Sequence, residues 1–159
     1  MEENGESFTR TTTRLLENLS NHYTGILLPC IGLQEQNISL VGYSVVNGST
    51  IVGFIPAQTS KGMIFIKADK PQFNYVMPYK NNQFTIQVKL KKRKVKPTYK
   101  NDEIHFEMSF EFDATLMYGD KRTPYHFTET DQANVTRSLE EMLKTELTEA
   151  VLLAQDYYK

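Results

Sequence analysis

The chain has 159 residues, of which 40% are hydrophobic and 23% charged, which is enough for one globular domain with its own core. Eighteen Lys and Arg against nineteen Asp and Glu give a formal net charge of -1, which excludes a whole-protein field that draws in nucleic acid or an acidic substrate. The single cysteine, Cys30, excludes an internal disulfide framework and a multi-thiolate metal site, and we expect it to be a small buried residue.

The first predicted element is an amphipathic helix over residues 8 to 20, with Ser7 as its cap. Its apolar stripe consists of Phe8, Thr12, Leu15, Leu16 and Leu19. Three consecutive threonines are poor helix formers, so this helix needs a partner surface, and we expect it to lie on a sheet.

Three β-branched apolar runs follow, at residues 24–28, 39–46 and 50–55, and each predicts a strand. Asn47-Gly48 joins the second run to the third and predicts a hairpin, because both residues tolerate positive φ. Residues 57–66 fit a short helix that runs into a strand, and periodicity does not separate the two structures there.

The clearest strand pattern lies in the middle of the chain. Residues 72–79 alternate, and two longer alternating runs, 84–91 and 104–113, predict an antiparallel pair joined by a turn at 97–102. A register in which paired numbers sum to about 200 sets Leu90 against Phe110 and Val88 against Phe112. On the other face it sets Arg93 against Glu107 and Lys89 against Glu111. We expect a buried set of Phe84, Val88, Leu90, Phe106, Phe110 and Phe112.

From about Asp131 the period changes to 3.6, which predicts a long C-terminal helix that covers the apolar face of the sheet. The expected fold is therefore α+β, mainly an antiparallel sheet with a long hairpin, one face of which carries the long C-terminal helix and the shorter N-terminal helix. No linker or repeat divides the chain, so we expect residues 1–159 to form a single domain.

The sequence offers little that predicts catalysis. His22, His105 and His126 have no metal-ligand spacing, and neither a nucleophile elbow nor a phosphate-binding glycine loop is present. Glu107, Glu111 and Asp113 share one strand face, but the facing cations favour a structural role over acid–base chemistry. We expect no enzyme activity, no cofactor and no metal.

The outstanding local feature is the basic stretch from Lys89 to Lys96. It suits either anionic lipid or an acidic partner surface, whereas the structural alternative is a strand whose lysines prevent edge-to-edge pairing. Nucleic acid fits poorly, because the stretch lacks aromatic residues for base stacking. The candidate interaction surface consists of Lys91, Lys92, Arg93, Lys94 and Lys96.

An ordered series of segments resembles the C-terminal domain of the Ger(x)C family of spore germination proteins. The segments cover most of residues 8–158 and consist of Leu27-Leu28-Pro29 with Ile31 and Leu33, Leu40 to Val46, Ile51 to Ile55, Ser60 to Phe65, Lys91 to Pro97 and the C-terminal helix. Ser44, Val46 and Ile55 depart from the family pattern in ways that packing accommodates.

The resemblance implies the lipoprotein C subunit of a nutrient germinant receptor, tethered by lipid to the outer face of the spore inner membrane. It implies partners in the A and B subunits, and it implies that this chain is a soluble domain excised from a longer protein with a lipidated cysteine. The implied role is non-enzymatic assembly or signalling, and the alternative is a small-molecule domain that binds the nutrient. Uniformly apolar buried faces weigh against the alternative.

Overall fold

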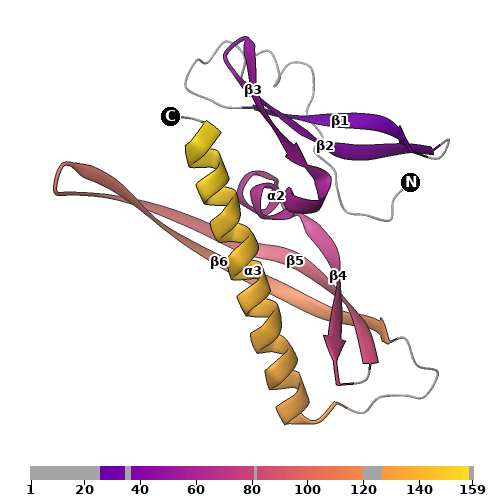
Figure 1. Cartoon of the computed structure of the whole chain (residues 1–159). Coiled ribbons are helices and arrows are strands. Elements are labelled where there is room, and N and C mark those ends of the chain that lie inside the picture. Colours follow the sequence, from indigo (N-terminus) through magenta and orange to yellow (C-terminus); the bar gives the residue numbers. More distant parts are fainter. Residues whose placement is uncertain (1–25, 35–36, 81, 120–126, 158–159) are drawn as a thin grey trace. The chain divides into compact units, whose positions relative to one another are not determined.

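A computed structural model describes residues 26–34, 37–80, 82–119 and 127–157. The helix expected over residues 8–20 lies outside these ranges. The described elements are β1 (Ile26–Gln34), β2 (Asn37–Asn47), β3 (Thr50–Pro56), η1 (Ala57–Thr59), α2 (Lys61–Lys67), β4 (Gln72–Tyr79), β5 (Asn82–Lys100), β6 (Glu103–Gly119) and α3 (Glu129–Tyr157). Figure 1 shows them in chain order. The α+β class, the antiparallel pairing, the long hairpin and the C-terminal helix are confirmed, but the strands form two three-stranded sheets.

The described residues divide into two compact units. Unit 1 comprises residues 68–141 and holds the sheet β4-β5-β6 with the first part of α3. Unit 2 comprises residues 26–67 and 142–157 and holds the sheet β1-β2-β3, α2 and the last part of α3.

In unit 2 the predicted hairpin between β2 and β3 is confirmed, with its turn one residue later than expected. Asn47 pairs with Thr50, so the turn residues are Gly48 and Ser49, and Gly48 has a φ of 59°. A positive φ at the first turn position suits glycine and matches the right-handed twist of the strands. The core of this unit consists of Ile26, Leu27, Tyr43, Val45, Val46, Ile55, Met63, Ile64, Phe65, Leu143 and Ala150.

The segment from 57 to 66 is helical on both sides of Ser60, and the strand considered for its second half is absent. The buried Ser60 joins η1 to α2, because its hydroxyl donates to the Ala57 carbonyl at 2.8 Å while its own carbonyl accepts from the Ile64 amide at 2.9 Å. Cys30 is half-buried rather than buried, and its Sγ lies 3.0 Å from Ser44 Oγ.

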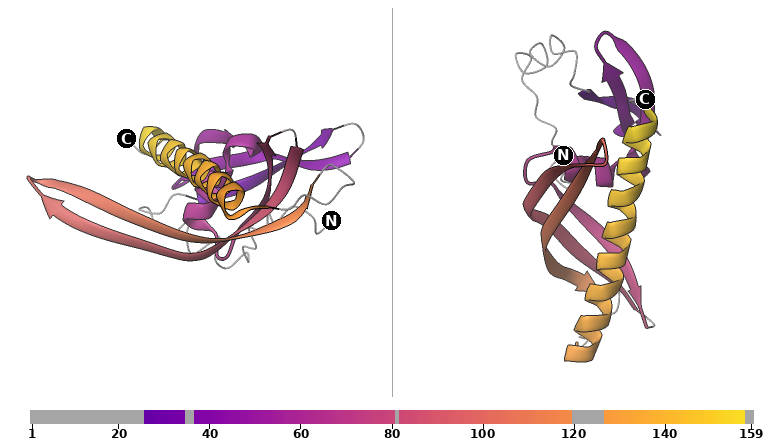
Figure 2. Two further views of the ribbon diagram at one scale, coloured as in Figure 1. Left: turned by 90° about the horizontal axis from the view of Figure 1, so that it is seen from below. Right: turned by 90° about the vertical axis from the view of Figure 1, so that its left-hand side faces the viewer.

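In unit 1, β4 pairs with β5 only as far as Gln72 opposite Lys89. Beyond that point β5 and β6 continue as a two-stranded ribbon, which we call the arm and define as Lys91–Lys100 with Glu103–Glu111. Figure 1 and the left view of Figure 2 show these strands running together past the beginning of β4. The expected turn at 97–102 is wrong in extent, because β5 runs to Lys100 and only Asn101 and Asp102, with φ of 54° and 60°, make the turn.

The expected register of this pair is also wrong, by two residues up to Leu90 and by three residues beyond it. Leu90 lies opposite Phe112, and Val88 lies opposite Ala114. An even shift keeps each side chain on its predicted face, so Phe84, Val88 and Leu90 are buried as expected. Phe110 and Phe112 are half-buried, with rings stacked at 6.2 Å between centroids, and Phe106 is exposed, so their predicted burial is wrong.

A β-bulge at Lys91 explains the geometry of the arm. Leu90 pairs with Phe112 and Lys92 with Glu111, so Lys91 is an extra residue on β5. Before the bulge, even-numbered side chains of β5 face the core. After it, odd-numbered side chains of β5 share a face with even-numbered side chains of β6. The pairs on this face are Arg93 with Phe110, Val95 with Met108, Pro97 with Phe106 and Tyr99 with Ile104.

A polar cluster fixes the beginning of α3 against β4. Asp131 and Thr128 form a reciprocal cap, in which Thr128 N and Oγ1 donate to Asp131 Oδ2 at 3.1 and 2.8 Å, and Asp131 N donates to Thr128 Oγ1 at 3.2 Å. Tyr79 and Lys80 reach the other carboxylate oxygen, Oδ1, at 2.9 and 2.6 Å. The hydrogen bond from Lys80, followed by those from Thr128, holds the pKa of Asp131 well below its usual range.

Candidate functional site

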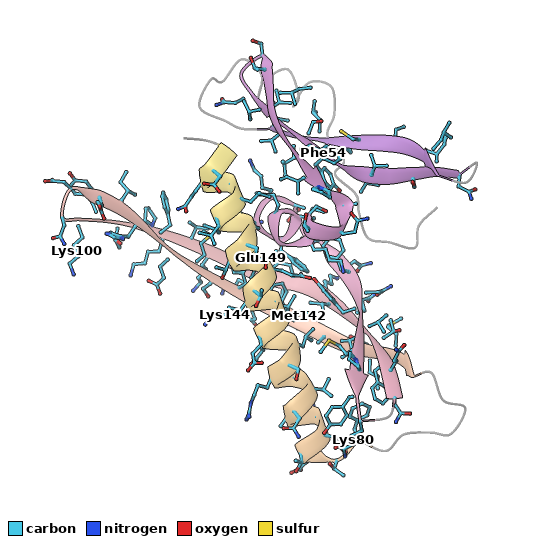
Figure 3. The ribbon with its side chains drawn as sticks, in the orientation of Figure 1. Phe54, Lys80, Lys100, Met142, Lys144 and Glu149 are labelled. Carbon is cyan, nitrogen blue, oxygen red and sulfur yellow. The ribbon has the colours of Figure 1, made fainter. Side chains whose placement is uncertain are left out.

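The basic stretch lies on β5, and its candidate surface residues belong to the arm. Every side chain from Lys91 to Lys100 is exposed. Figure 3 labels Lys100, which lies at the far end of the arm next to the turn. A two-stranded ribbon has no third layer of its own, so both of its faces are available for contact.

Two of the five candidate residues are engaged within unit 1. The Lys91 ammonium lies 2.8 Å from Glu111 Oε1 and 3.8 Å from Asp113 Oδ1. The hydrogen bond and charge of this pair raise the pKa of Lys91 and lower the pKa of Glu111. Arg93 Nη1 donates to the Ala68 carbonyl at 3.2 Å.

The expected cross-strand ion pairs are therefore wrong. Lys89 lies opposite Asp113 rather than Glu111, and Arg93 lies opposite Phe110 rather than Glu107. The position of the turn causes both errors, because a turn at Asn101 and Asp102 shifts the register along the whole pair. The bulge reverses this shift by one residue before Lys91 and brings Lys91 to Glu111.

The other three candidates lie on the polar face of the arm. Lys92, Lys94 and Lys96 stand opposite Glu111, Ser109 and Glu107, and Lys100 continues the row opposite Glu103. Among the described residues these four lysines make no ion pair, although Lys92 and Lys94 add at longer range to the lowered pKa of Glu111. All four side chains are exposed, and Thr98 interrupts the row between Lys96 and Lys100.

The opposite face of the arm is apolar and exposed, whereas the sequence predicted that Phe106 and Phe110 are buried and did not place Val95 and Tyr99 beside them. Val95 and Tyr99 of β5 and Ile104 and Phe106 of β6 are 49% to 71% exposed, and Pro97 and Met108 lie between them. A signal was present in the sequence: apolar residues stand at even positions up to Leu90 and then at Val95 and Tyr99. That change of parity indicates a bulge.

A second exposed apolar surface lies at the end of the β1–β2 hairpin in unit 2. Ile31 pairs with Leu40 and Leu33 with Ile38, so these side chains share one face. Ile31, Leu33 and Ile38 are 60% to 79% exposed. Residues 26–34 and 37–60 contain no Asp, Glu, Lys or Arg, so no charge protects the edges of this sheet.

Unit 1 also contains an open groove of about 290 Å³ between the sheet and α3. Ile86, Ala114 and Leu116 line it from the sheet, and Gln132 and Thr136 place polar side chains among the apolar ones of α3. In the part of the chain that the structure describes, no group of three or more His, Cys, Asp or Glu side chains could hold a metal ion. His105 Nε2 lies 3.7 Å from Glu103 at the exposed arm, and His22 and His126 lie outside the described residues.

Comparison with known proteins identifies the family. Residues 41–159 match the family model described as spore germination B3/GerAC-like, C-terminal. The chain belongs to this family. The resemblance to the C-terminal domain of spore germination proteins is thereby confirmed, and it connects the chain with spore germination and germinant receptors. Among curated proteins no match was found.

A solved relative shows the fold of this GerAC-like domain. A crystal structure of the GerBC protein matches with a TM-score of 0.73 at 17% sequence identity, over 94% of this chain and 47% of that chain. The chain thus spans about half the length of that relative. Within the described residues of this GerAC-like chain, no helix combines the length and the apolar content that crossing a membrane requires.

Proposed function

We propose that the chain is a non-enzymatic assembly and signalling module of a nutrient germinant receptor, where it contacts the A and B subunits. The family match over residues 41–159 supports a role in spore germination. In this proposal the full-length protein is a C subunit that is anchored by lipid at the outer face of the spore inner membrane.

The observation that carries the assembly role is the uncharged sheet of unit 2. The side chains of Ile31, Leu33 and Ile38 are aliphatic and exposed. Their sheet has no charged residue in 26–34 and 37–60, so they form a surface that water solvates poorly. Soluble proteins normally place lysines or other charges on exposed edge strands to prevent pairing. Their absence favours a permanent protein contact, and we assign this surface to another receptor subunit.

In-cell photocrosslinking tests the assignment. A photoreactive amino acid replaces Leu33, and a matched control replaces Asn74, which is exposed on β4 of unit 1. We expect crosslinks from position 33 to the A or B subunit in dormant spores and none from position 74. Equal yields at the two positions, or no crosslink to either subunit from position 33 at normal receptor levels, would contradict the proposal.

Among the described residues, the groove between the sheet and α3 in unit 1 is the larger of two cavities and the candidate location for the nutrient-binding alternative. Its polar groups are few, and its volume is at the lower end for small-molecule sites. A thermal-shift screen against amino acids, sugars and nucleosides separates the alternatives. A ligand at a hundred times its dissociation constant adds about 2.7 kcal/mol of stability, so a clear shift that Gln132→Ala abolishes would replace the assembly role with nutrient binding.

A further inference from the structure

We propose that the arm is a membrane-contact element, which inserts its apolar face into the interface of an anionic lipid bilayer and places its lysines among the phosphate groups. This surface is separate from the β1–β2 surface of the proposed subunit contact and does not depend on that assignment.

The apolar face of the arm has the composition of an interfacial segment. Tyr99, Ile104 and Phe106 are 60% to 71% exposed near the turn, and Val95 and Met108 extend the face toward the bulge. Tyr99 combines an apolar ring with a hydroxyl that donates to Asp102 Oδ1 at 2.9 Å, which suits a ring at the boundary of water and lipid. The face carries one charged side chain, Arg93, at its base.

The polar face of the arm carries a small excess of positive charge, although Lys96 and Lys100 stand opposite Glu107 and Glu103. From Lys91 to Glu111 the arm has six Lys and Arg and four Asp and Glu, although the whole chain has a net charge of -1. Glu111, the acid opposite Lys92, is bound at 2.8 Å by Lys91 instead. A lysine side chain can keep its aliphatic part in an apolar region while its ammonium group reaches the charged lipid surface. In this way Lys92, Lys94, Lys96 and Lys100 reach the headgroups beside the inserted face.

The geometry favours lipid over a folded partner. Lys92, Lys94 and Lys96 repeat at every second residue, about 7 Å apart, and make no ion pair among the described residues, which suits a fluid layer of phosphates better than a set of fixed carboxylates. The arm also has unpaired backbone groups along both edges, which excludes deep insertion into hydrocarbon. It is therefore expected to lie in the interfacial layer, at about 5 to 10 Å depth.

A single tryptophan provides the test, because the chain has none of its own. The variant Phe106→Trp places the fluorophore on the apolar face of the arm. The matched control Val76→Trp places it on β4 of the same unit at nearly the same exposure, 62% against 60%. Each purified full chain is mixed with vesicles of phosphatidylglycerol and phosphatidylcholine in equal parts, and separately with phosphatidylcholine alone.

We expect the emission of Phe106→Trp to shift to the blue with the anionic vesicles and to stay unchanged with the neutral ones, while Val76→Trp responds to neither. Adding Lys92→Glu, Lys94→Glu and Lys96→Glu to the Phe106→Trp variant should weaken partitioning more than about a hundredfold without a change in melting temperature. An unmoved Phe106→Trp spectrum, an equal shift at position 76, or a shift that the lysine substitutions leave intact would each overturn the proposal. A response to purified A or B subunit in place of vesicles would reassign the arm to protein docking.

Discussion

The backbone carbonyl oxygen of Glu146 lies so close to Gly62 that a Cβ added to the glycine would stand 2.1 Å from it. The same Cβ would lie 3.0 Å from the Cβ of Ala150. Within unit 2, helix α2 therefore packs directly on the backbone of α3. Gly62 lies in the segment Ser60 to Phe65, one of those that carry the family resemblance, so close helix packing explains its presence there.

The first prediction reverses a general rule. Replacing glycine by alanine inside a helix normally stabilises it by about 1 kcal/mol. Gly62→Ala should instead destabilise the protein by about 1 to 3 kcal/mol, because α2 must move away from α3. Urea unfolding monitored by circular dichroism measures the change, with exposed Gln58→Ala as control. A Gly62→Ala protein that is as stable as the control would mean that α2 and α3 are not in contact.

The second prediction compares two aliphatic side chains on the same face of the β5–β6 pair. Leu90 is 5% exposed and precedes the bulge, whereas Ile104 is 63% exposed near the end of the arm. Leu90→Ala should cost about 2 to 5 kcal/mol and Ile104→Ala less than about 0.5 kcal/mol. Similar losses in the two variants would show that the end of the arm is packed in solution.

Phe110 is half-buried, so its exposure lies between that of Leu90 and that of Ile104. If its ring were fully buried, as the alternation in the sequence predicted, truncation to alanine would cost about 3 to 5 kcal/mol. We now expect Phe110→Ala to cost less than Leu90→Ala in the same urea titration. A larger loss for Phe110 would restore the original assignment of its burial.

The sequence predicted what local patterns determine and missed what depends on strand register. Alternation identified β4, β5 and β6, and the 3.6 period identified α3 almost from its first residue. Register depends on where the turn lies, and alternation did not place the turn within residues 97–102. The change of parity between Leu90 and Val95, which indicates the bulge at Lys91, was overlooked. For that reason the cations of the surface were found, whereas their pairing and the apolar face behind them were not.

The third prediction concerns the loss of folding stability at low pH. Its contacts hold the pKa of Asp131 below the ordinary value of 3.8, so the unfolded chain binds more protons than the folded one as pH falls. The contribution of Asp131 to stability is therefore complete above about pH 5 and is lost progressively on acidification below that. Asp131→Asn should destabilise the protein at pH 7 and flatten the pH dependence between 5 and 3, as thermal melts will show. Glu140→Gln, an exposed change on the same helix, serves as control, and parallel acid limbs in wild type and Asp131→Asn would contradict the prediction.

The fourth prediction concerns the end of α3. Deleting the chain from Leu147 onward removes Ala150, which is buried in unit 2, and Ala154, which lines a cavity with Leu27, Val45, Ile55 and Met63. The exposed apolar surface should produce aggregated or molten protein that binds a hydrophobic dye. Size-exclusion chromatography and amide exchange provide the measurement. A monomeric product with native exchange protection in β1–β3 would show that α3 is dispensable for this unit.

The bulge at Lys91 sets a rule for how the arm can change in length. Residues added or removed in equal number on both strands beyond it leave Leu90 and the packed part of the sheet in place. Loss of one residue between Lys91 and Val95 on β5 alone has a different effect, because it shifts the outer register by one residue and moves Val95 and Tyr99 to the charged face. Related chains should therefore tolerate arms of different reach, provided that insertions and deletions are matched across the two strands.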